Sequence, residues 1–156
     1  MIKNLLFAIT LTVTINSFAG DTTNIQVHDH TDMTWNGNYD EWGVFPDGSK
    51  TYRKIYLHYT MGCASSGCSD WDYTTKIEVL HRTGQLDTSL NEIIESYELA
   101  RVITPYGNGL NNNWEFTHIF DITDFASILK DSVEIRAHYS GWSSGFSATL
   151  DFEFIE

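Results

Sequence analysis

Short runs in which apolar and polar residues alternate are the feature that most constrains the fold of this chain. In the run from Tyr52 to Met61, every second residue from Ile55 onward is apolar or aromatic, so these side chains share one face of an extended strand. Comparable runs cover residues 25–28, 73–81, 94–103, 114–122, 133–139 and 148–155, with Gly, Asn, Asp, Ser or Pro at their ends. This spacing predicts an all-β fold, either a β-sandwich or a jelly roll.

The segments between these runs contain one helical candidate and two conspicuous loops. Residues 124–130 fit about two helical turns, with Thr123 or Asp121 as the cap. The apolar side of this helix would hold Phe125, Ile128 and Leu129. Residues 106–113 and 140–145 are rich in Gly, Asn or Ser and predict loops, which on β-sandwiches often carry function.

The N-terminus has the pattern of a secretory signal peptide. Lys3 gives the positive start, residues 5–15 give the apolar core, and Ser17-Phe-Ala19 gives the cleavage motif. We expect a signal peptide over residues 1–19 and one exported domain over residues 20–156, periplasmic, extracellular or on the cell surface. The apolar run is too short to cross a bilayer and none later is longer, so we expect no membrane anchor.

The charge balance narrows the choice of partner. The chain has a formal net charge of −12, and cleavage of the signal would remove the positive charge of Lys3. A strongly acidic domain is a poor partner for nucleic acid or for an anionic membrane surface. We therefore expect neutral or basic ligands.

The segment Met61-Gly-Cys-Ala-Ser-Ser-Gly-Cys-Ser-Asp-Trp-Asp72 is the strongest candidate for a functional site. In an exported protein, Cys63 and Cys68 favour a disulfide over a metal site or free thiols, and four intervening residues leave room for it. The disulfide would fix the backbone before Asp70 and Asp72, and a fixed acid suits carbonyl or glycosyl chemistry. Alternatively, Asp72 is a capping carboxylate that orders the turn by accepting backbone N–H bonds.

Three motifs together resemble the N-terminal domain of the peptide-N-glycosidase F family. They are Cys63 to Cys68 followed by Trp71-Asp72, the run Arg101-Val-Ile-Thr-Pro-Tyr106, and the run from Phe120 to Leu129, in the same order as in the family. The resemblance covers nearly all of residues 20–156. It implies an eight-stranded jelly roll, the first of two, in a secreted bacterial amidase without a cofactor. Such an enzyme cleaves the bond between an asparagine side chain and N-acetylglucosamine in N-glycoproteins.

The resemblance also implies site residues and shows where this chain departs from the family. Asp72 matches the principal catalytic aspartate, and Asp70 matches an acidic neighbour. Ser140 stands where the family has a supporting glutamate, and Tyr73 where it has an arginine. The expected substrate-binding surface consists of Asp70, Tyr73, Ser140 and Trp142. A further glutamate belongs to the second domain, which these 156 residues lack. We therefore expect the isolated domain to be inactive and to need that second jelly roll as its partner.

The tryptophans and histidines leave several alternatives open. Alternation places Trp71 opposite Asp72 and predicts it in the core, whereas Trp142 is either core or a face for sugar rings. Trp35 and Trp42 flank residues 37–40 as a platform or a strand edge. His28 and His30 share a strand face on which His58 would complete a metal set, but solvated strand histidines are the simpler interpretation. We predict no metal site, because the aspartates also do not match a calcium loop.

Two non-enzymatic functions are alternatives to the amidase. In the first, the chain is a glycan- or protein-binding module that kept the scaffold after losing the glutamate at Ser140. In the second, it is a purely structural domain of a larger protein. Glycan binding without cleavage distinguishes the binding module, and the absence of glycan binding distinguishes the structural domain.

Overall fold

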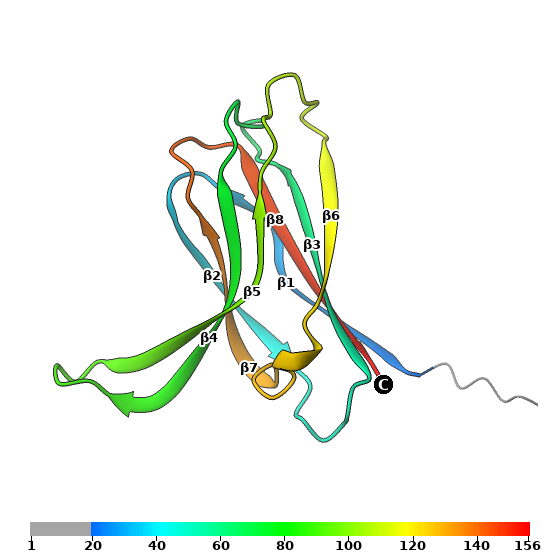
Figure 1. The fold of residues 1–156 in the computed structure, drawn as a ribbon, viewed down its shortest axis with the longest axis vertical. Coiled ribbons are helices and arrows are strands. Elements are labelled where there is room, and N and C mark those ends of the chain that lie inside the picture. Colours follow the sequence, from blue (N-terminus) through cyan, green and yellow to red (C-terminus); the bar gives the residue numbers. More distant parts are fainter. Residues whose placement is uncertain (1–19) are drawn as a thin grey trace, which may run out of the picture.

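Two four-stranded antiparallel sheets pack face to face in the computed structural model, which describes residues 20–156 (Figure 1). The signal peptide predicted over residues 1–19 lies outside the described residues. One sheet has the order β1 (Thr22–Met33), β8 (Phe146–Ile155), β3 (Lys54–Cys63) and β6 (Glu115–Asp121). The other has the order β2 (Gly37–Phe45), β7 (Asp131–Tyr139), β4 (Thr74–Leu86) and β5 (Glu92–Ile103). The predicted all-β jelly-roll sandwich is confirmed.

The alternating residues of the strands form the core between the two sheets. The predicted face of β3, from Ile55 to Met61, is buried, and so are Ile135 and Ala137 of β7 on the facing sheet. Phe45 packs edge-on against Phe152, with ring centroids 5.1 Å apart. The buried aliphatic and aromatic area supplies the main driving force for folding.

One strand was not predicted from the sequence. β2 lies at the edge of its sheet and pairs only with β7, so most of its residues remain exposed and its alternation is weak. Gly43 interrupts the pattern as well, because a Cβ there would lie 2.6 Å from the Phe45 ring and 2.7 Å from Val27. An edge strand that carries a packing glycine resembles a loop in sequence.

The helix predicted over residues 124–130 is wrong. Only a 3₁₀ turn forms, at Thr123–Phe125, and Asp121 accepts the Thr123 N–H at 3.1 Å instead of capping a helix. The connection from β6 must cross to the other sheet and start β7 at Asp131, whose φ is +59°. The apolar side chains of the segment still pack on the core, and Leu129 is buried.

Strand β4 belongs to the sandwich over only part of its length. It pairs with β7 as far as Leu80 and beyond that residue only with β5. The two strands continue as a hairpin that projects from the sandwich, and residues 84–98 are exposed (Figure 1).

His28 connects the two sheets and is fully buried. Its Nε2 lies 3.1 Å from the Ile135 carbonyl oxygen, which can only accept, so Nε2 carries the proton. Nδ1 lies 3.1 Å from the Thr31 hydroxyl and accepts from it. The strand bulges on both sides of His28, and His30 is exposed with φ +48°. The two histidines therefore do not share a face, contrary to the metal interpretation.

The buried position of His28 predicts a loss of stability in mild acid. Burial is the main cause that lowers the pKa of His28 below its usual value. The neutral form stabilises the fold above about pH 6.5, and this contribution is lost as the pH falls through the lowered pKa. We expect His28→Gln to reduce the dependence of the urea midpoint on pH between about 6.5 and 5. His81→Gln, at an exposed position, is the control, and an unchanged pH dependence in His28→Gln would contradict this role.

Candidate functional site

Four connections gather at one end of the sandwich, at the top of Figure 1. They are the β1–β2 turn (residues 34–36) and the β3–β4, β5–β6 and β7–β8 loops (residues 64–73, 104–114 and 140–145). Every site residue predicted from the sequence lies in these loops or next to them: Asp70, Asp72, Tyr73, Ser140 and Trp142. The fold therefore brings the predicted residues to one end.

The predicted disulfide between Cys63 and Cys68 is present, with the Cα atoms 4.5 Å apart. Within the loop that it closes, the Gly67 N–H donates to the Ala64 carbonyl at 2.8 Å. Gly67 has φ +98°, a conformation that favours glycine. The disulfide and this tight turn fix the chain as it leaves β3 and enters the segment with the two aspartates.

Ser69 is the point at which three of the loops meet. Its side chain and backbone are buried, with 5% exposure. The Ser69 hydroxyl lies 2.8 Å from that of Ser143, and its carbonyl accepts the Gly107 N–H at 2.8 Å. Glycine is required on both sides, because a Cβ at Gly107 or Gly145 would lie 2.1 Å from a backbone atom of Ser69.

Further hydrogen bonds attach the β3–β4 loop to the β7–β8 loop. The Tyr73 and Ser143 hydroxyls are 3.2 Å apart, and those of Ser66 and Ser144 are 2.7 Å apart. The Ser140 hydroxyl accepts the Thr74 N–H at 3.0 Å. Ser140 therefore holds the start of β4, a task that a side-chain hydroxyl performs without any acidic function.

Asp70 and Asp72 are both exposed at this end of the sandwich. Among residues 20–156, no backbone N–H donates to the Asp72 carboxylate, so this part of the chain gives no support to the capping alternative. The nearby Asp72 carboxylate is the main cause that raises the pKa of Tyr106 above its usual value. Tyr106 was not predicted as a site residue, although it lies in one of the family-like motifs.

Large aromatic side chains are exposed around the aspartates. Trp71, Trp142 and Tyr106 are each 63% exposed, and Trp35 is 55% exposed. The prediction of Trp71 in the core is wrong, because the chain bends at residues 70–71 and β4 begins only at Thr74, so no strand alternation applies to Trp71. Trp142 was left open and lies on the surface, so its ring is free to contact a ligand.

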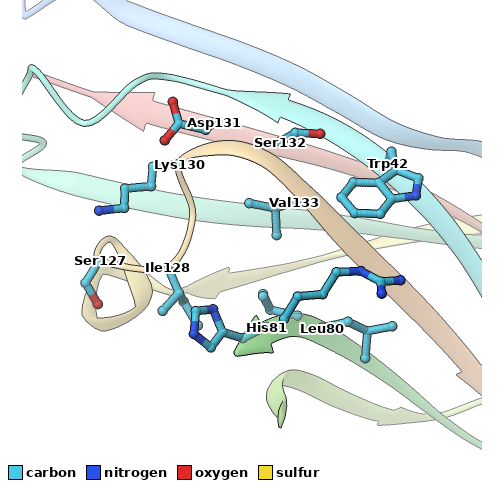
Figure 2. Close-up of a pocket in the computed structure, with 11 residues that line it drawn as sticks. Trp42, Leu80, His81, Ser127, Ile128, Lys130, Asp131, Ser132 and Val133 are labelled. Atoms are coloured by element: carbon cyan, nitrogen blue, oxygen red, sulfur yellow. The ribbon is translucent and has the colours of Figure 1, made fainter. Parts of the chain in front are cut away.

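Two hollows show how the surface is shaped. One lies beside the loops that carry the aspartates, and the other lies far from them. A groove of about 470 Å³ adjoins the disulfide and is lined by His30, Gly62, Cys63, Ala64, Ser65, Asn112, Asn113, Trp114 and Glu115. The pocket in Figure 2, of about 270 Å³, lies near the opposite ends of β4 and β7. There Arg82 lies over the Trp42 ring at 5.6 Å and pairs with Glu92 and Glu134. This pocket contains none of the predicted site residues.

The chemical groups at the loop end suit a neutral, polar ligand. Carboxylates, hydroxyls and exposed indole rings are available, and within residues 20–156 no three His, Cys, Asp or Glu side chains cluster as metal ligands. His58, the third histidine of the metal interpretation, pairs with Glu153 at 2.9 Å. The described part of the chain has no helix long and apolar enough to cross a membrane.

The close approach to Ser69 predicts that a single methyl group disturbs this end. We expect Gly145→Ala to lower the free energy of unfolding by about 1–3 kcal/mol, because its Cβ would overlap Ser69. Gly37→Ala is a matched control, since the nearest atom to its Cβ would be 3.6 Å away. Urea denaturation measures both, and equal stability of the two variants would contradict the packing argument.

The disulfide is expected to matter more for local shape than for global stability. Cys63→Ser with Cys68→Ser removes a loop so short that the entropic contribution is only about 2 kcal/mol. The double variant should remain folded, and the amide chemical shifts of residues 64–73 should change more than those of β3 and β7. Unfolding of the variant near room temperature would contradict this expectation.

The chain matches no protein-family model, but it is similar in sequence to a known amidase. Over 146 residues it is 25% identical to the peptide-N(4)-(N-acetyl-beta-D-glucosaminyl)asparagine amidase F of Elizabethkingia miricola, a match that covers 90% of the chain and 38% of that protein.

Solved structures agree with this match. PNGase F, a glycosylasparaginase from Flavobacterium meningosepticum, superposes with a TM-score of 0.63 at 24% identity over 86% of this chain and 42% of its own. PNGF-II superposes with a TM-score of 0.64 at 14% identity, over 86% and 34% of the two chains. The chain thus spans about two-fifths or less of the length of these relatives. The sequence similarity and the shared sandwich support the assignment of this chain as a domain of the peptide-N-glycosidase F family.

Proposed function

We propose that the chain is the N-terminal domain of a secreted amidase that hydrolyses the bond between asparagine and N-acetylglucosamine in N-glycoproteins. One observation carries the proposal. Asp72, which the resemblance matches to the family's catalytic aspartate, is exposed on a segment that the disulfide and the contacts of Ser69 hold in place. A solvent-accessible carboxylate on a braced backbone segment suits a positioned proton acceptor.

Hydrolysis of this linkage needs an attacking water, a proton for the departing glycosylamine and support for the developing oxyanion. We assign the orientation of the water to Asp72. Asp70 and Tyr73 belong to the surface that binds the substrate, together with Ser140 and Trp142. Ser140 cannot supply a carboxylate, so the complementary acid must come from elsewhere.

The complementary acid that hydrolysis needs is assigned to a second jelly-roll domain. The chain spans only 38% of the length of its amidase relative, which leaves room for that domain. Hydrolysis then occurs only in the complete product, and residues 20–156 alone bind substrate without turnover. Residues 1–19 act as the signal peptide, and the disulfide fits an exported protein.

A non-catalytic glycan-binding module is the second candidate. Two observations favour it: a serine replaces the supporting glutamate at Ser140, and the surrounding tryptophans are exposed. Aromatic faces bind sugar rings without any acid.

The test is an assay of the full-length product on a denatured N-glycoprotein. We expect released glycan and conversion of the linked asparagine to aspartate, read by mass spectrometry. Asp72→Asn should reduce release by at least about 100-fold, because it removes the proton acceptor, with the melting temperature nearly unchanged.

Asp124→Asn is the control for the loss of one exposed negative charge far from the site. Glycan binding without release by the wild-type product would instead support the binding module. A large loss of stability in Asp72→Asn would mark Asp72 as a structural residue.

A further inference from the structure

The projecting hairpin of β4 and β5 carries an exposed leucine at its tip, in an unusual backbone conformation. Leu90 is 78% exposed, and its φ is +65°, in the left-handed region that a leucine rarely adopts. The Asp87 side chain fixes the tip, because one carboxylate oxygen accepts the N–H groups of Ser89 and Asn91 at 2.8 and 2.9 Å. The Leu90 N–H donates to the Asp87 carbonyl at 3.1 Å. The tip therefore presents a large apolar side chain to solvent on an ordered turn.

At the base of the hairpin, β4 and β7 separate and leave the pocket shown in Figure 2. β7 pairs with β2 from Asp131 onward, but with β4 only from Glu134 onward. On the β4 side of residues 131–133, no strand of the described part of the chain is paired. The apolar lining of the pocket consists of Trp42, Val79, Leu80, Ile128 and Val133. An apolar hollow thus lies where the sheet splits.

The size of this pocket favours a side chain as its occupant over a small molecule. Pockets that enclose a small-molecule ligand usually measure roughly 300–1,000 Å³. This pocket, at about 270 Å³, is smaller.

The charges of the hairpin complement those at the edge of the pocket. Residues 83–98 contain four carboxylates and no lysine or arginine, and within residues 20–156 neither Asp87 nor Glu95 forms an ion pair. Lys130 lines the pocket and also has no ion pair in this part of the chain. Asp131 lines it too, but its carboxylate points away from His81 in Figure 2. An acidic, apolar tip therefore matches an apolar pocket beside a free lysine.

We propose that the hairpin and the pocket form an interface between two copies of the chain, in which Leu90 of each copy enters the pocket of the other. The extended hairpin holds its tip roughly 20 Å from its base, so Leu90 does not fill its own pocket. Two hairpins related by a two-fold axis run side by side in opposite directions, and each tip then meets the base of the other. Such an interface closes as a dimer. In it, Asp87 lies near the partner's Lys130.

Arg82 holds the hairpin in position for this contact. Its guanidinium donates to Glu92 of β5 and to Glu134 of β7, both at 2.9 Å, and lies 5.6 Å from the centroid of the Trp42 ring of β2. One side chain of β4 thus connects all four strands of this sheet at the point where the hairpin departs. A hairpin that is already held at its base loses less conformational entropy on association than a mobile one.

The experiment is sedimentation velocity of the full-length product over a wide range of protein concentration, in which we expect a monomer–dimer equilibrium. Leu90→Ala should raise the dissociation constant of the dimer at least about tenfold, because it removes an apolar side chain that is buried in the interface. Val44→Ala is the matched control, since Val44 is 77% exposed but does not line this pocket. A monomer at every concentration, or equal dissociation constants for the wild type and Leu90→Ala, would overturn the proposal.

A second measurement locates the interface. In a mixture of methyl-labelled and unlabelled copies of the same protein, we expect intermolecular NOEs between the Leu90 methyl groups and those of Ile128 or Val133. A dimer whose intermolecular contacts all lie elsewhere would refute this geometry. Lys130→Glu should weaken the dimer, whereas Arg53→Glu, a charge reversal outside the pocket, should not. The inference does not depend on the proposed amidase: an inactive product that dimerises keeps it, and an active product that stays monomeric refutes it alone.

Discussion

The approach of three loops to Ser69 is the constraint on which the candidate site depends. Backbone atoms of Ser69 lie where side chains at Gly107 and Gly145 would be, so the loops interlock at a distance that only glycine permits. Serine hydroxyls then connect the loops by short hydrogen bonds. The direction of the Asp72 segment is thus set by packing between loops, to which the disulfide adds a local brace.

The sandwich contributes the placement of these loops. The antiparallel strands place four connections at one end, and the buried residues of β3 and β7 pack the two sheets against each other. In such a fold, the core provides the stability of the domain, and the loops at one end carry the exposed side chains of the candidate site. The polar contacts around Ser69 position these loops.

Strands with one buried face were predictable from sequence, because burial imposes the period of two. β2 was missed because it lies at an edge and contains Gly43, and the helix was overestimated because a short crossing between sheets overrode its apolar spacing. Asp72 and the disulfide could be predicted, because both cysteines and both aspartates lie in the short segment from Met61 to Asp72. The exposed position of Trp71 and the contact of Trp35 with Trp142 could not, since both depend on how separate loops bend and meet in space.

The projecting β4–β5 hairpin has a different kind of consequence. Its strands pair only with each other and turn away from the loop end, so few contacts connect its length to the rest of the domain. Insertions or deletions there alter no packing near Ser69. Evolution can therefore change how copies of the chain associate through the hairpin while the candidate site stays intact.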